Sequence, residues 1–131
     1  MFDSAAINAS LETVLERLPD PVPLVYERLY ADYPETVALF FLDPDGRRRE
    51  HMLSVTFETL LDFIGDKRFA VSMLHCERIN HAELGVPPEV YTRFFWVVRD
   101  AFRDFLGNDW TPQFDAAWDG LLEELQEVVH A

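Results

Sequence analysis

Residues 80–91 read NHAELGVPPEVY, and this stretch decides the fold of the chain around it. Gly85 supplies the free backbone torsion that commonly ends a helix, and Pro87-Pro88 is typical of the first turn of the next one. His81 lies shortly before the break, near the end of the earlier helix. The stretch therefore predicts two helices joined by a sharp corner, with a histidine close to that corner.

Apolar residues at helical spacing continue on both sides of this corner. With the Pro and Gly boundary signals, they predict helical segments over residues 4–18, 21–32, 34–39, 47–64, 69–84, from Pro87 to Gly107 and from Thr111 onward. The residues assigned to inward faces include Ile7, Leu15, Leu53, Leu61, Phe105 and Trp118. Strand alternation is not found. About seven segments in one domain, residues 1–131, predict an all-α orthogonal bundle, because a parallel four-helix bundle prefers fewer, longer helices.

The composition supports a folded domain and excludes some partners. Of the 131 residues, 49% are hydrophobic, which is enough to build a core. The formal net charge is −13 at pH 7. A surface this negative repels phosphate backbones and anionic lipid. We therefore expect no nucleic-acid partner and no membrane partner.

The sequence also carries signals about location. A single cysteine, Cys76, cannot form an internal disulfide and fits a reducing compartment. Residues 1–18 lack a basic start followed by an apolar run, so no signal peptide is expected. No apolar stretch approaches the roughly 20 residues that span a bilayer. A cytoplasmic location is the expectation.

Two stretches carry a resemblance to a known family. Residues 25–40 read VYERLYADYPETVALF, and the second stretch is the corner at residues 80–91. Together they resemble the bacterial single-domain haemoglobins and the globin domains of flavohaemoglobins, and the likeness covers nearly the whole chain. It implies a globin-like bundle that holds haem b. Tyr26 falls at the family's distal tyrosine, Pro34 at the proline of the short third helix, and Phe40 at the phenylalanine that wedges against the haem.

The corner supplies the expected iron ligand. His81 falls at the family's proximal histidine, and haem iron needs a neutral imidazole nitrogen from a rigid helix. The second ring nitrogen then needs an acceptor, which Tyr91 or a backbone carbonyl could supply. Tyr91 falls at the proximal-side tyrosine, with an ordinary core tyrosine as the alternative. His75 is the competing ligand, but nothing downstream of it matches the family.

The walls of the expected haem pocket follow from the chemistry of the porphyrin. Haem is flat and largely apolar, so its contacts should be aliphatic and aromatic. The resemblance assigns these contacts to Phe40, Leu53, Phe57, Val86, Tyr91, Phe94 and Val98. Arg47, Arg48 and Arg78 are the candidates for the propionates, with no choice made among them.

The distal side has two readings. Tyr26 can donate a hydrogen bond to a bound gas through its hydroxyl. Counting back from His81 places Arg49 at the distal gate with Leu53 one turn later, which is the preferred register. A shift of two positions would place His51 at the gate and Val55 behind it. Arginine departs from the family's usual Gln or His, and Arg49 could instead belong to a solvated charged face.

The resemblance implies reversible binding of a diatomic gas, dioxygen or nitric oxide, at iron ligated by His81. Flavohaemoglobins also carry a glutamate late in the last helix. The positions of Glu123, Glu124 and Glu127 do not match the position of that glutamate. The sequence has no flavin or nicotinamide motif. Nitric oxide dioxygenation would therefore need an external reductase, and enzymatic activity of this chain alone is not expected. The alternative function is a globin-fold sensor or interaction module, with or without haem, and a homodimer is compatible with either function.

Overall fold

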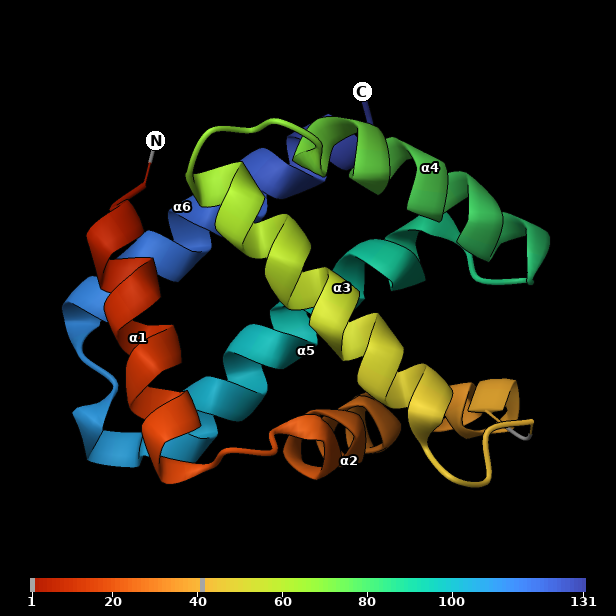
Figure 1. The fold of residues 1–131 in the computed structure, drawn as a ribbon, viewed down its shortest axis with the longest axis horizontal. Coiled ribbons are helices and arrows are strands. Elements are labelled where there is room, and N and C mark those ends of the chain that lie inside the picture. The colour runs from red at the N-terminus through yellow and green to blue at the C-terminus, as the bar shows by residue number, and fades with distance from the viewer. Residues whose placement is uncertain (1, 41) are drawn as a thin grey trace.

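Helices form all of the regular structure in the described residues of this chain (Figure 1). The computed structural model describes residues 2–40 and 42–131. The elements in chain order are α1 (Ser4–Arg17), α2 (Val22–Asp32), the 3-10 helix η1 (Pro34–Phe40), α3 (Arg47–Ile64), α4 (Ala70–Glu83), α5 (Pro88–Leu106), the 3-10 helix η2 (Gly107–Asp109) and α6 (Pro112–Val129). No strand occurs in the described residues. The predicted all-α fold is confirmed, and each predicted helical segment is present.

The corner between α4 and α5 has the geometry that its sequence predicts. Gly85 adopts a φ of 89°, a left-handed conformation that a residue with a Cβ rarely accepts. The chain then folds back so that the backbone N–H of Val86 donates to the carbonyl of His81 at 2.8 Å. Pro87 and Pro88 follow and begin α5. The backbone of His81 is thus held by the turn that ends its own helix.

The helices cross one another in Figure 1 instead of running side by side, as in an orthogonal bundle. Helix α2 packs on α5, α1 packs on α6, and α4 contacts α3, α5 and α6. Within the described residues, no helix is both long and apolar enough to cross a bilayer.

The burial of individual side chains confirms most of the predicted inward-facing residues and contradicts three of them. Ile7, Leu53 and Trp118 are buried as expected. The prediction was wrong for Leu15, Leu61 and Phe105, which are 37%, 47% and 37% exposed. A helix buries one stripe of its surface, and in α3 the fully buried Phe63 takes the inward place that was assigned to Leu61.

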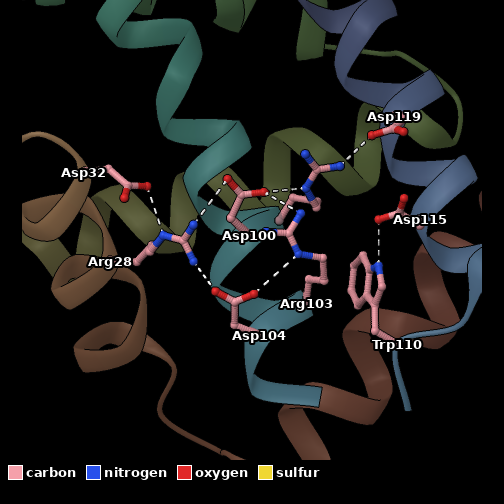
Figure 2. A network of polar contacts seen from close by, with 9 residues as sticks. Arg28, Asp32, Asp100, Arg103, Asp104, Trp110, Asp115 and Asp119 are labelled. Carbon is pink, nitrogen blue, oxygen red and sulfur yellow. Dashed lines mark hydrogen bonds and ion pairs between the residues drawn. The ribbon is translucent and has the colours of Figure 1, made fainter. Parts of the chain in front are cut away.

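Ion pairs join α2 to α5 and α5 to α6 on the surface (Figure 2). Arg28 of α2 contacts Asp104 and Asp100 of α5. Arg99 of α5, which is 7% exposed, donates to Asp119 of α6 at 2.6 Å. In the pairs that involve Asp104 and Asp119, the aspartate is largely open to solvent, at 57% and 49%, and ion pairs with such an exposed partner contribute about 0–1 kcal/mol each. Most of the stability of these helix contacts therefore comes from the apolar side chains beneath them.

Two aspartates hold the N-terminal ends of α3 and α4. The carboxylate of Asp43 accepts the backbone N–H groups of Arg48 and Arg49 at 2.9 and 3.1 Å. Asp62 accepts the N–H groups of three consecutive residues at the start of α4, at 3.1, 2.9 and 2.7 Å. Negative charge at a helix N-terminus satisfies its free N–H groups and its dipole. Each of these two helices, which contribute to the cavity wall, is thus anchored at its N-terminus by a carboxylate.

These carboxylates make the fold sensitive to acid. Burial opposes the charge of Asp43 and of Asp62, but the N–H donors outweigh it, and the pKa of each lies below its ordinary value of 3.8. Because folding lowers these pKa values, their contribution is present above about pH 4 and is lost as the pH falls through the lowered values. We expect Asp43→Asn with Asp62→Asn to flatten the loss of unfolding free energy between about pH 5 and pH 2.

The measurement is urea unfolding followed by circular dichroism over this pH range. Asp66→Asn is the matched control, because Asp66 is a 73% exposed aspartate in the loop between the same two helices. If the double variant and the control lose stability as steeply as the original chain, the two carboxylates do not set the acid sensitivity.

Candidate functional site

A largely apolar cavity of about 450 Å³ lies among α2, η1, α3, α4 and α5. Ligand pockets in proteins commonly have volumes of about 300–1,000 Å³ and apolar walls. Its apolar lining includes Leu29, Phe40, Met52, Val55, Met73, Val86, Val90, Phe94 and Phe95. The cavity is therefore of a size and character that suits an apolar organic ligand.

Few polar side chains remain available inside this cavity. Thr36, Thr56 and Thr59 line the cavity, but the hydroxyl of each already donates to a nearby backbone carbonyl at 2.7–2.8 Å. The titratable side chains in the lining are Arg48, His51, Glu77, His81 and Tyr91. A ligand in the cavity would meet polar chemistry mainly at these five positions.

His81 presents one ring nitrogen as a potential metal ligand. Its Nδ1 lies 2.7 Å from the main-chain carbonyl oxygen of Glu77, one turn earlier on α4. A carbonyl can only accept, so Nδ1 carries the proton in this contact. In the neutral imidazole, Nε2 then keeps its lone pair. The structure thus answers the question of the acceptor in favour of a backbone carbonyl over the hydroxyl of Tyr91.

Tyr91 lies beside the imidazole. The ring centroids of His81 and Tyr91 are 4.9 Å apart, and Tyr91 packs edge-on against Phe95 at 5.8 Å. Burial raises the pKa of the Tyr91 hydroxyl, and the nearby carboxylate of Glu77 raises it further. Tyr91 is therefore a neutral wall of the cavity that packs beside the imidazole.

On α3, the structure places His51 and Val55 in the cavity lining, and Arg49 and Leu53 outside it. The guanidinium of Arg49 donates to the Asp43 carboxylate at 3.0 Å and to the Asp43 carbonyl at 3.0 Å. Asp43 is 3% exposed, and a buried carboxylate strongly favours a cationic partner. Leu53 is 1% exposed and lies in the core. The cavity lining on α3 thus contains the two residues of the alternative register, and their role toward a bound gas stays a prediction.

Tyr26 lies behind the cavity wall instead of in it. Its ring packs edge-on against Phe40 at 5.5 Å and tilted against Phe94 at 5.8 Å, and both of those residues do line the cavity. Its hydroxyl donates to the main-chain carbonyl of Arg49 at 3.0 Å. Burial raises the pKa of this hydroxyl, so it stays neutral. A direct bond from Tyr26 to a bound gas stays a prediction.

The structure brings together four of the predicted wall residues and leaves three aside. Phe40, Val86, Tyr91 and Phe94 line the cavity. Leu53, as noted above, does not; Phe57 instead stacks on Phe102 at 6.0 Å, and Val98 is fully buried. Sequence reasoning missed Leu29, Met52, Met73 and Val90. The spacing of Met52, Val55, Thr56 and Thr59 along one helical face is the signal that could have found the α3 wall.

Comparison with known protein families adds an independent finding. The family model described as Globin matches residues 24–129. The chain belongs to the globin family. No curated protein matches the chain closely enough to count as a relative. Membership of this family implies haem binding and the binding of a diatomic gas.

The cavity of this globin fits a haem on several counts. Leu39, Leu42 and Leu84 line its mouth and are 47%, 61% and 74% exposed. Apolar side chains exposed together usually mark a binding site, and a flat apolar ligand in the cavity would cover them. His81 offers an unprotonated nitrogen from the α4 side, as described above.

A cation for the propionates is also present. Of the three candidate arginines of this globin, Arg47 pairs with Asp45 at 3.1 Å and Arg78 donates to the carbonyl of Val129. Arg48 lines the cavity, and its exposed side chain reaches solvent. His75, the competing ligand, lies outside the lining and its Nε2 is 2.8 Å from the carbonyl of Val128. The donor set therefore suits haem bound from the α4 side.

Proposed function

We propose that this globin binds haem b in the cavity with Nε2 of His81 as the iron ligand, and that it reversibly binds dioxygen or nitric oxide. The observation that carries the proposal is the hydrogen bond from Nδ1 of His81 to the carbonyl of Glu77. It leaves the lone pair of Nε2 free on a side chain that lines a largely apolar cavity. Haem, when bound, supplies the iron at which a diatomic gas is held.

The chain's own residues have three tasks in this proposal. Phe40, Phe94 and Val86 form dry walls that keep water from the ligand. Arg48 stays at the mouth, where a guanidinium suits carboxylate groups such as propionates. The position of His81 at the end of α4, locked by the turn at Gly85, holds the imidazole at one place and angle.

The polar group of the distal side is His51 in this proposal. His51 lines the cavity, whereas the guanidinium of Arg49 is held by Asp43 and the hydroxyl of Tyr26 by the carbonyl of Arg49. His51 is exposed as well as cavity-lining, so it can turn between the ligand and solvent. That placement suits a gate that also donates a hydrogen bond.

The test of haem binding is titration of the purified chain with haemin, followed by absorption spectra of the ferric, ferrous and CO-bound forms. The proposal expects a saturable Soret band at one haem per chain. A chain that stays colourless in the presence of haemin would overturn the proposal and favour the sensor or interaction module without haem.

The distal assignment predicts a specific difference between two variants. We expect His51→Leu to speed the dissociation of dioxygen roughly tenfold, because a lost hydrogen bond of about 1.4 kcal/mol changes a rate or affinity by that factor. Arg49→Gln is the matched control and should change the rate less than about twofold. Stopped-flow or flash photolysis measures both rates. A larger increase of the dissociation rate in Arg49→Gln than in His51→Leu would identify Arg49 as the distal gate.

A further inference from the structure

Glu77 lies one turn before His81 on α4 and faces it in two ways. Its main-chain carbonyl accepts from Nδ1 at 2.7 Å, and its carboxylate oxygen Oε2 lies 3.6 Å from the same nitrogen. Residues four apart on a helix are neighbours on its surface. Both side chains line the cavity, and they are 33% and 20% exposed. The carboxylate is thus held beside the imidazole by the helix itself.

This pair differs from an ordinary surface ion pair. The proton on Nδ1 is already donated to the main-chain carbonyl, so the carboxylate adds negative charge next to an existing hydrogen bond. Partial burial weakens the screening that makes fully exposed pairs ineffective.

We propose that Glu77 is a positioning residue for His81, whose carboxylate orients the imidazole and strengthens Nε2 as an electron donor toward haem iron. Acceptors on the second nitrogen of a metal-binding histidine fix its tautomer and raise its basicity. A more basic ligand favours the ferric over the ferrous state, so Glu77 lowers the reduction potential of bound haem. This inference rests on the proposed function, because it needs iron at Nε2.

The experiment compares Glu77→Gln with Glu83→Gln in the haem-loaded chain. Glu83 is an exposed glutamate at the end of the same helix and outside the cavity lining, so the two variants change the net charge equally. Spectroelectrochemistry gives the reduction potential, and resonance Raman spectroscopy of the ferrous form gives the iron–histidine stretching frequency. Glu77→Gln should raise the potential and lower the frequency, and Glu83→Gln should leave both unchanged. Glu77→Asp keeps the charge and should lie closer to the original chain.

A second readout needs no haem. Nitrogen-15 NMR of the haem-free chain reports which nitrogen of His81 carries the proton. Glu77→Gln should lower the fraction of the Nδ1–H tautomer, and Glu83→Gln should not. The haem-free readout keeps the two proposals distinguishable. If haemin does not bind, the proposed function and the effect on the iron are overturned. The tautomer of His81 in the haem-free chain then still decides whether Glu77 orients the imidazole.

The results that overturn the proposal are equally specific. Equal shifts of the potential in Glu77→Gln and Glu83→Gln would assign the effect to net charge alone. An unchanged potential and frequency in Glu77→Gln would leave the main-chain carbonyl as the whole control on His81.

Discussion

Replacing His81 with alanine should abolish the Soret band of the haem-loaded chain while the helical content stays the same. The imidazole is the side chain that offers a free nitrogen from α4, and the apolar walls alone cannot hold iron. Loss of a residue that only hydrogen-bonds to a metal ligand commonly costs about 10–100-fold in metal affinity, so loss of the ligand itself should cost more than about 100-fold. Haemin titration monitored by absorption measures the affinity, and circular dichroism measures the helical content.

Two controls sharpen this experiment. His75→Ala removes a histidine from the same helix whose Nε2 contacts the carbonyl of Val128 outside the cavity, and it should keep the Soret band. His81→Gly should recover the band when free imidazole is added, because the ligand can then re-enter the space that the side chain left. Haemin uptake by His81→Ala with the spectrum of the original chain would exclude His81 as the ligand.

Replacing Trp118 with alanine should lower the free energy of unfolding by about 3–5 kcal/mol, because large-to-small changes in a core lose burial and leave a cavity. Trp118 of α6 is fully buried, its ring lies 6.4 Å from that of Trp110, and its Nε1 donates to Ser10 of α1 at 2.9 Å. A domain of this size has a total stability of roughly 5–15 kcal/mol. The loss should be visible as a large shift of the urea midpoint.

The chain offers matched variants for this prediction. Trp118→Phe keeps most of the apolar ring, and Ser10 keeps its own bond to the carbonyl of Ile7 at 2.7 Å, so no hydroxyl proton is left unpaired. We expect it to cost about 1–2 kcal/mol. Trp96→Ala removes a partly exposed tryptophan that packs under Arg99 and should cost less than Trp118→Ala. A larger loss of unfolding free energy in Trp96→Ala than in Trp118→Ala would contradict the assignment of Trp118 to the centre of the core.

The helices and their ends could be predicted from the sequence because their signals are local. Gly85 and the two prolines after it act on the backbone torsions of adjacent residues, and the corner formed where they predict it. The same holds for Thr111, whose hydroxyl caps α6 by accepting from Phe114 at 3.0 Å. The position of His81 near the end of its helix followed from these signals, and the structure places it in the cavity lining.

The side chains that surround the cavity were decided by contacts between distant segments. Counting along the chain favoured Arg49 and Leu53 for the distal wall, but the buried Asp43 in the preceding turn holds the guanidinium and turns the neighbouring face, with His51, to the cavity. A count of residues does not describe the path of the turn between η1 and α3, so it does not determine the rotation of α3 about its axis.

The sequence by itself thus determined an all-α chain, a corner after residue 84 and a histidine placed just before it. Only the tertiary structure decided that Tyr26 bonds to the backbone of α3 and that Phe63 is buried in place of Leu61. The physical reason is range: backbone torsions are set by neighbouring residues, whereas the partner of a side chain is set by whichever helix packs against it.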